Sequence, residues 1–177
     1  CFAFNEILPG GFTPRFGGVV TDMSLVFGTK GELENDITYD VSLNLGENEV
    51  DFLISNTINP SLGPDTPFEF SPGRYIQSEQ TLDIDFTKPF EMGLYEPLFV
   101  ASGFQYRHES YESIAGDTAS YEIGPLATQG FGIGSNGFPG LAANSQGEVS
   151  RHNIAFYVDA EAYVTENFML AAALRYE

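Results

Sequence analysis

Two histidines, His108 and His152, are the only imidazole groups among the 177 residues of the chain. Neither belongs to a sequence cluster that could supply the three or four ligands of a zinc centre. No arrangement of Ser, His and Asp, or of Cys and His, is typical of a nucleophilic site. We therefore predict that both histidines lie at strand ends or in loops. We also predict no metal site, no catalytic residue and no enzymatic activity.

A glycine motif, residues 132–137 (GIGSNG), matches the pattern G-x-G-x-x-G. A dinucleotide site needs that turn between a parallel strand and a helix, but here no helical pattern follows the Gly- and Pro-rich stretch. We expect its glycines to supply positive φ angles in a compact loop. A second role is ligand contact by this loop, for which we predict Phe131, Asn136 and Phe138. Packing of the two phenylalanines against neighbouring residues is the alternative.

Two pairs of carboxylates have the two-residue spacing that places both members on one face of a strand. They are Asp83 with Asp85, and Asp159 with Glu161. Such pairs could bind Ca²⁺ or act as an acid and a base. We predict the simpler arrangement, a wet surface of solvated or arginine-paired carboxylates, with no cofactor beyond adventitious Ca²⁺.

The chain is strongly acidic. It has 7 Lys and Arg against 25 Asp and Glu, so its formal charge is 7 − 25 = −18. This balance argues against nucleic acid as a partner and against docking on anionic lipid through a basic patch. With 42% hydrophobic residues, the chain is too apolar for a disordered acidic tail. Its single cysteine, Cys1, excludes an internal disulfide, and either acylation as in a bacterial lipoprotein or an arbitrary chain boundary would explain its position.

Period-2 alternation of apolar and polar residues is the main structural signal. In residues 37–45 every odd position is apolar and every even position is polar, and residues 81–87 and 154–164 follow the same pattern. Together with weaker examples, the pattern predicts six strands, at residues 20–29, 37–45, 81–87, 98–108, 154–164 and 168–176.

The connections between these strands alternate in length. Residues 30–36, 88–97 and 165–167 form short turns, whereas residues 53–73 and 115–151 form long connections rich in Gly, Pro, Asn and Ser. Outer-membrane barrels have short periplasmic turns and long external loops, and their strands cross the bilayer with roughly 9–11 residues. We therefore predict an all-β, antiparallel up-and-down meander of about six strands, part of a transmembrane β-barrel with its apolar face on lipid. A soluble ligand-binding barrel with an inward apolar face is an alternative.

Six strands are too few to close a barrel, for which about eight is the small limit. An open sheet with two free edges and a lipid-facing side is not a stable isolated object. We therefore interpret residues 1–177 as a single β-barrel segment of something larger, completed either by further polypeptide or by several copies that meet edge to edge.

Six stretches resemble the barrel region of TonB-dependent outer-membrane receptors, through their order and spacing more than through any single motif. They are residues 12–18 (FTPRFGG), 21–28 (TDMSLVFG), 39–52 (YDVSLNLGENEVDF), 59–67 (NPSLGPDTP), 124–140 (GPLATQGFGIGSNGFPG) and 156–177 (FYVDAEAYVTENFMLAAALRYE). The resemblance extends over nearly the whole chain, from Phe12 onwards.

This resemblance implies a barrel of about 22 strands, an N-terminal plug domain and energised uptake of a scarce nutrient such as an iron–siderophore complex, cobalamin or an oligosaccharide. It implies three partners: outer-membrane lipid, the small-molecule nutrient, and an energy-transducing inner-membrane protein that acts through the plug. The chain departs from the family because no plug domain or TonB-contacting segment is visible and Lys and Arg are scarce. We therefore expect a barrel segment of a receptor in the bacterial outer membrane.

The alternative function is an extracellular, cell-surface structural subunit whose copies assemble into a filament or layer by β-strand addition. Other copies of the chain would then be its partners. Residues 1–8 (CFAFNEIL) alternate loosely and could be the donated strand.

Overall fold

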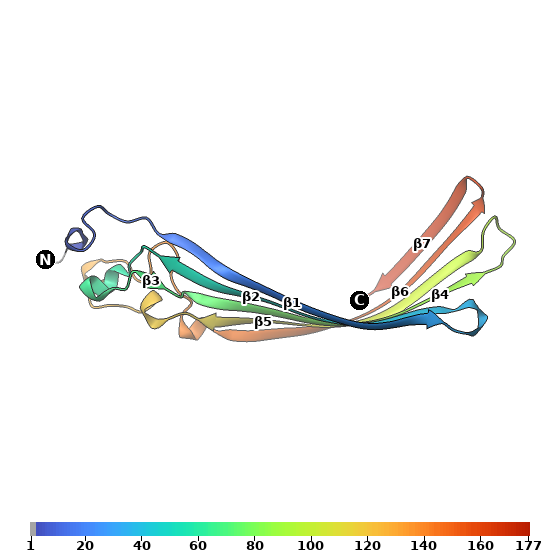
Figure 1. Ribbon diagram of the computed structural model, residues 1–177, viewed down its shortest axis with the longest axis horizontal. Coiled ribbons are helices and arrows are strands. Elements are labelled where there is room, and N and C mark those ends of the chain that lie inside the picture. The colour runs from blue at the N-terminus through green and yellow to red at the C-terminus, as the bar shows by residue number, and fades with distance from the viewer. Residues whose placement is uncertain (1–2) are drawn as a thin grey trace. The chain divides into compact units, whose positions relative to one another are not determined.

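The computed structural model describes residues 3–177, so the interpretations of Cys1 lie outside the described residues. Figure 1 shows long strands joined by turns and by connections with short 3₁₀ helices (η). The strands are β1 (Arg15–Glu32), β2 (Thr38–Ser55), β3 (Glu69–Phe70), β4 (Gly73–Phe90), β5 (Leu98–Ala115), β6 (Gly147–Thr165) and β7 (Phe168–Tyr176). The 3₁₀ helices are η1 (Phe4–Glu6), η2 (Glu34–Asp36), η3 (Pro60–Asp65), η4 (Thr118–Ser120), η5 (Ala127–Gln129) and η6 (Ala143–Ser145).

The long strands form one sheet in the order β1-β2-β4-β5-β6-β7, and the short β3 pairs with the end of β2 through Ile54 and Phe70. Each long strand lies beside the next long strand in the sequence, which confirms the predicted all-β, antiparallel up-and-down meander of about six strands. Within residues 3–177 the sheet is not closed, and β1 and β7 are its two edges.

Five of the strands are longer than their alternation patterns predicted. β2 continues from Leu45 to Ser55, and β4 begins at Gly73, eight residues before the predicted start at Thr81. The reason is that backbone pairing with a neighbouring strand continues where the side-chain pattern changes. In the extended part of β2, for example, Asn48 donates a hydrogen bond to Asp22 of β1, and Asp51 pairs with Arg74 of β4.

The alternation of short and long connections is confirmed. Residues 33–37, 91–97 and 166–167 join neighbouring strands in short turns, whereas residues 56–72 and 116–146 are long. The described part of the proposed donated strand forms η1 at Phe4–Glu6, because Glu6 and Ile7 donate backbone hydrogen bonds to Ala3 and Phe4. No helix in the described part of the chain has the length and apolarity that a bilayer crossing requires.

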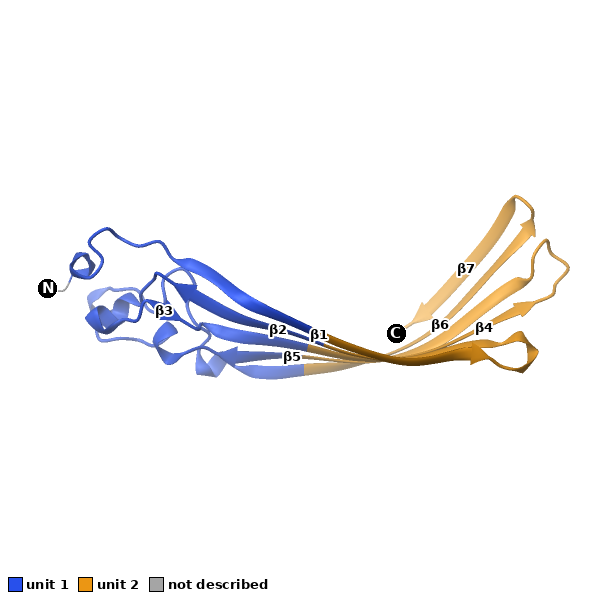
Figure 2. Ribbon diagram, viewed as in Figure 1, with its two compact units in different colours: residues 1–22, 47–77, 111–149 blue, residues 23–46, 78–110, 150–177 orange. Residues whose placement is uncertain are grey.

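Two compact units divide the chain, and their boundary crosses β1, β2, β4, β5 and β6 (Figure 2). Unit 1 contains residues 1–22, 47–77 and 111–149, and unit 2 contains residues 23–46, 78–110 and 150–177. Both long connections belong to unit 1, and all three short turns belong to unit 2.

Unit 1 has a small buried core where the two long connections pack on the strands. Ile54 of β2, Ile58 and Phe70 are almost completely buried there, together with the polar residues Thr57 and Asn59. Unit 2 differs, because its only buried residues are Thr81, Ala155 and Ala162. Unit 2 is therefore a single-layer sheet whose two faces are both accessible.

Candidate functional site

The strands of unit 2 present one apolar and one polar face. In the β6–β7 pair, Val158 lies opposite Leu174 on one face, while Tyr157 lies opposite Arg175 on the other. Phe104 of β5 contacts the ring of Phe156, so it lies on the same face as Val158 and Leu174. We define the apolar face as Met23, Leu25, Phe27, Tyr39, Val41, Leu43, Leu45, Leu82, Ile84, Phe86, Phe104, Ile154, Phe156, Val158, Leu170 and Leu174.

Much of this apolar face is exposed. Met23 and Phe27 of β1 are 61% and 57% accessible, and Phe156 and Leu174 are 55% and 76% accessible. Single exposed apolar side chains are normal on a protein surface, but a contiguous field across neighbouring strands marks a surface that has a partner or contacts a membrane.

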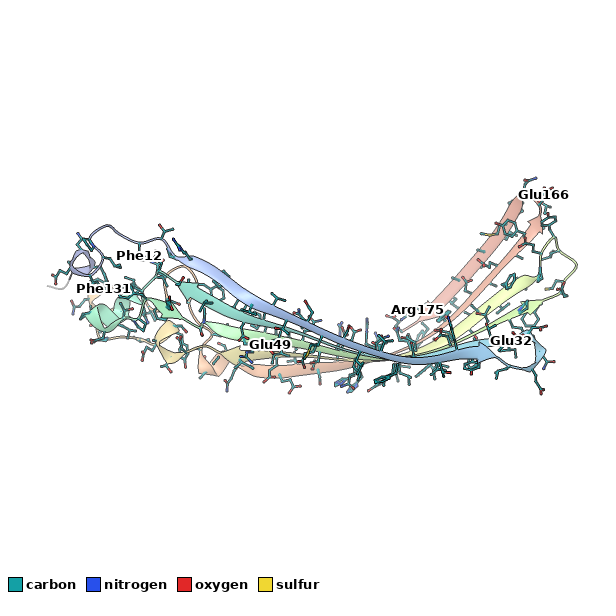
Figure 3. The ribbon with its side chains drawn as sticks, in the orientation of Figure 1. Phe12, Glu32, Glu49, Phe131, Glu166 and Arg175 are labelled. Atoms are coloured by element: carbon teal, nitrogen blue, oxygen red, sulfur yellow. The ribbon has the colours of Figure 1, made fainter. Side chains whose placement is uncertain are left out.

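The polar face carries a chain of side-chain hydrogen bonds across β4, β5 and β7. Gln105 donates through Nε2 to Asp83 Oδ1 at 2.7 Å, and its Oε1 accepts from Arg175 Nη2 at 2.9 Å. Arg175, labelled in Figure 3, also pairs with Glu177. The predicted shared face of Asp83 and Asp85 is present, but their hydrogen-bond partners are Gln105 and Tyr157, whereas solvent or arginine was expected.

Gly103 lies between Asp85 and Tyr157 on this polar face. The Tyr157 hydroxyl donates to Asp85 Oδ1 at 2.7 Å, spanning from β6 to β4 across β5. A Cβ at Gly103 would collide with the Tyr157 ring and with the Asp85 carboxylate. The missing side chain therefore allows the tyrosine to reach across an intervening strand.

We expect Gly103→Val to destabilise the folded chain by about 1–3 kcal/mol, because the new side chain overfills the space above Gly103 (the Gly103 notch) and separates Tyr157 from Asp85. The matched control is Gly46→Val in β2, where nothing lies within 4 Å of the added Cβ. Urea unfolding in detergent micelles, followed by circular dichroism, measures both. Equal stability of Gly103→Val and the wild type would contradict this role.

A hollow of about 460 Å³ lies at the short-turn end of unit 2. Its lining includes one cation, Lys30, and three carboxylates, Glu32, Asp40 and Asp85, together with Thr38 and Thr87. The Thr38 hydroxyl is within 3.4 Å of the Thr87 carbonyl oxygen, which joins β2 to β4 there. The residues present can bind a small polar solute, and they include no pairing of nucleophile and base.

The two histidines lie inside strands, which corrects the prediction of strand-end or loop positions. His108 of β5 and His152 of β6 stack with ring centroids 4.4 Å apart and an interplanar angle of 12°. The Tyr106 hydroxyl lies 2.8 Å from His152 Nδ1. The correction follows from strand length, since β5 and β6 extend past the polar residues that were taken as their ends. Among residues 3–177 no group of three or more His, Cys, Asp or Glu is arranged to hold a metal ion.

The acidic residues of β2 in unit 1 are strand residues and not loop residues. Glu49, labelled in Figure 3, and Asp51 follow the odd-numbered series of this strand. Arg74 of β4 lies 2.9 Å from Glu49 and 2.6 Å from Asp51. The odd-numbered positions of β2 are therefore apolar up to Leu45 and acidic after it, and Arg74 partly neutralises the acidic positions.

The predicted ligand residues have packing roles in unit 1. Phe138 belongs to an aromatic cluster, with ring centroids 4.6 Å from Phe16 and 5.5 Å from Phe52. Phe131, labelled in Figure 3, makes an edge contact with Phe4 at 5.6 Å. The backbone of Asn136 donates to Ile58 and accepts from the Thr57 hydroxyl, while the residue itself stays exposed. Ligand contact by Phe131, Asn136 and Phe138 stays a prediction.

The glycine motif at residues 132–137 lies in a loop between η5 and η6 and precedes no α-helix. Gly134 and Gly137 have φ angles of 80° and 99°, which confirms the expected left-handed backbone at two of the three motif glycines. The Gly134 amide also donates to Asn59, so this loop is tied to the other long connection.

Asn59 is a buried residue that links the two long connections, and no sequence pattern pointed to it. Its side chain is fully buried. Its Nδ2 donates to the carbonyl oxygens of Ala119 and Glu122, at 2.9 and 3.0 Å. Its Oδ1 accepts from the amide and hydroxyl of Ser61 and from the amide of Gly134. The Asn59-Pro60 pair is a turn signal, but the sequence alone does not indicate these partners.

The comparisons with known proteins give no match: no family model, no curated protein and no solved structure corresponds to this chain. The features that bear on function are therefore the two faces of unit 2 and the hydrogen-bonded long connections of unit 1.

Proposed function

We propose that the chain forms part of the wall of an outer-membrane β-barrel, with the apolar face of unit 2 against lipid and its polar face towards the barrel interior. The observation that supports this proposal is the exposed apolar face of a single-layer sheet. In water such a face would be covered by a second layer, because a sheet needs to bury its apolar side. In a bilayer, lipid covers it.

The dimensions of the apolar face agree with this proposal. The alternating runs of residues 37–45 and 154–164 have 9 and 11 residues, and a tilted membrane-crossing strand needs roughly 9–11 residues. Along β2 the apolar series ends before Glu47, Glu49 and Asp51, whose charges would be costly in hydrocarbon. These three carboxylates would then lie outside the hydrocarbon region.

The narrower proposal is that this barrel is a receptor-transporter of the kind that the sequence resembles, TonB-dependent outer-membrane receptors. Support comes from the long connections, which are held in place by buried hydrogen bonds and would serve as a preorganised external surface for ligand capture. The ligand would be a scarce nutrient such as an iron–siderophore complex, cobalamin or an oligosaccharide. An energy-transducing inner-membrane partner would act through a plug domain.

We expect the full chain in detergent micelles to bind one member of a panel comprising a ferric hydroxamate siderophore, cyanocobalamin and maltohexaose. The double substitution Phe131→Ala and Asn136→Ala should weaken that binding about tenfold, because both residues lie in the predicted ligand loop. Isothermal titration calorimetry measures the affinity, and Asn144→Ala in η6 is the control. The ligand loop would be contradicted if the double variant bound the ligand as tightly as the wild type. It would also be contradicted if Asn144→Ala weakened binding as much as the double substitution does.

A second candidate is the extracellular structural subunit that assembles by strand addition. It is favoured by the edge strand β1, whose residues are exposed along almost its whole length. Light scattering without detergent separates the two functions. Ordered multimers of the detergent-free chain would support the subunit, whereas recovery only in detergent or lipid would support the barrel wall.

A further inference from the structure

A groove at the short-turn end of unit 2 has a lysine among apolar side chains. Its volume is about 440 Å³, within the usual range for small-molecule sites of roughly 300–1,000 Å³. It lies between the turn that joins β1 to β2 and the adjoining parts of β4 and β5. Its lining includes Leu33, Ile37, Phe86, Lys88, Phe90 and Val100.

Lys88 is the only cationic residue in this groove, and the chain has few others, with 7 Lys and Arg in total. Its Nζ lies 5.3 Å from the centre of the Phe90 ring. Glu34, Asp36 and Glu91 occupy the neighbouring turns, yet within residues 3–177 none of them forms an ion pair with Lys88. The groove therefore presents an unneutralised ammonium group beside apolar walls.

An ammonium group next to an apolar groove complements a ligand that has an anionic head and a hydrocarbon chain. We propose that this groove binds one glycerophospholipid, with its phosphate on Lys88 and an acyl chain along Phe86, Phe90 and Val100. The inference rests on the proposed function, under which the short turns face the periplasm and the groove opens to the inner leaflet. Glycerophospholipids form that leaflet, and lysine side chains near the ends of membrane segments reach towards their head groups.

Two features distinguish this groove from an ordinary interfacial lysine. Lys88 is half-buried and lies between Phe86 and Phe90 on the same strand face, with its Nζ beside the Phe90 ring. Leu33 and Ile37 come from a separate turn and provide the opposite wall. Two apolar walls beside the lysine would hold one lipid at one place, whereas an isolated interfacial lysine would exchange among many lipids.

The test counts lipids bound to the full chain by native mass spectrometry from detergent micelles, with dipalmitoylphosphatidylglycerol as the probe. We expect one retained lipid on the wild type. Lys88→Gln should weaken retention about tenfold, since a charge-assisted contact is lost. Val100→Trp should abolish retention by filling the groove while Lys88 remains. The control Lys30→Gln removes a cation that lines the hollow of the polar face, and it should retain the lipid as the wild type does.

Two further probes identify the chemistry. Dipalmitoylglycerol, which has no phosphate, should bind at least tenfold more weakly, and glycerol 3-phosphate, which has no acyl chain, should not compete. Each of three results would overturn the lipid site. Lys88→Gln could retain the lipid as well as the wild type does, Lys30→Gln could lose as much lipid as Lys88→Gln, or glycerol 3-phosphate could displace the lipid completely.

Liposome flotation of the same variants separates this inference from the proposed function. If all variants float with the liposomes but lipid retention does not depend on Lys88, the lipid site is wrong and the barrel wall stands. If the wild type does not float, both are wrong.

Discussion

Val41→Arg is expected to lower the free energy of unfolding in lipid vesicles by about 2–4 kcal/mol, the cost of an arginine on the lipid face of a barrel near the bilayer midplane. Val41 is the central residue of the apolar run 37–45 and belongs to the apolar face. Its neighbour Ser42 points to the opposite side of the same strand. Ser42→Arg adds the same side chain on the polar face and should change the free energy by less than about 1 kcal/mol.

Urea titration in dimyristoylphosphatidylcholine vesicles, followed by circular dichroism, measures this pair of variants. The comparison depends on the face and not on arginine itself, because both variants carry the same charge at adjacent positions. Equal losses for Val41→Arg and Ser42→Arg would contradict a lipid-facing apolar side. A larger loss for Ser42→Arg would contradict it as well, because the face of Ser42 would then be the enclosed side of the sheet.

Asn59→Ala is expected to release the two long connections from each other. The substitution leaves the carbonyl oxygens of Ala119 and Glu122 and the amide of Gly134 without their present partner. Each buried group left unsatisfied costs about 1–3 kcal/mol, so we expect a local loss of about 3 kcal/mol or more. Amide hydrogen exchange in residues 116–146 should then accelerate on the order of 100-fold.

Hydrogen-exchange mass spectrometry of the full chain in micelles measures this effect segment by segment. The matched control is Asn136→Ala, since Asn136 makes its contacts to Ile58 and Thr57 through its backbone. Exchange in residues 154–164 of unit 2 should stay at the wild-type rate in both variants. Unchanged exchange in residues 116–146 of Asn59→Ala would show that Asn59 does not hold the connections together.

The alternation of the sequence was sufficient to predict the all-β meander and the order of its connections. It was insufficient for strand length, as β2 and β4 show. β2 changes from apolar to acidic residues after Leu45, and the pattern alone suggests an end there. The strand continues because its backbone stays paired with the neighbouring strands, and Arg74 of β4 pairs with Glu49 and Asp51 there. Cross-strand pairing of this kind depends on register, which the sequence of a single strand does not specify.

The candidate site was predictable to a similar extent. The shared face of Asp83 and Asp85 follows from two-residue spacing and was foreseen. The notch at Gly103 was not, because its partners Asp85 and Tyr157 come from two other strands. The stacking of His108 on His152 likewise requires the pairing of β5 with β6 to be known. Asn59 was missed because its hydrogen-bond partners come from residues about 60 to 75 positions further along the chain.

The most direct test of a lipid-facing apolar side is the environment of successive side chains along β2 in a lipid bilayer. In a Cys1→Ser background, spin labels are attached to single cysteines at positions 40 to 45, and electron paramagnetic resonance measures their accessibility to oxygen and to a water-soluble nickel complex. A membrane-spanning wall predicts alternation, with oxygen favoured at 41, 43 and 45 and nickel at 40, 42 and 44. Accessibility to nickel at all six positions, or alternation with the opposite phase, would contradict a membrane-spanning wall.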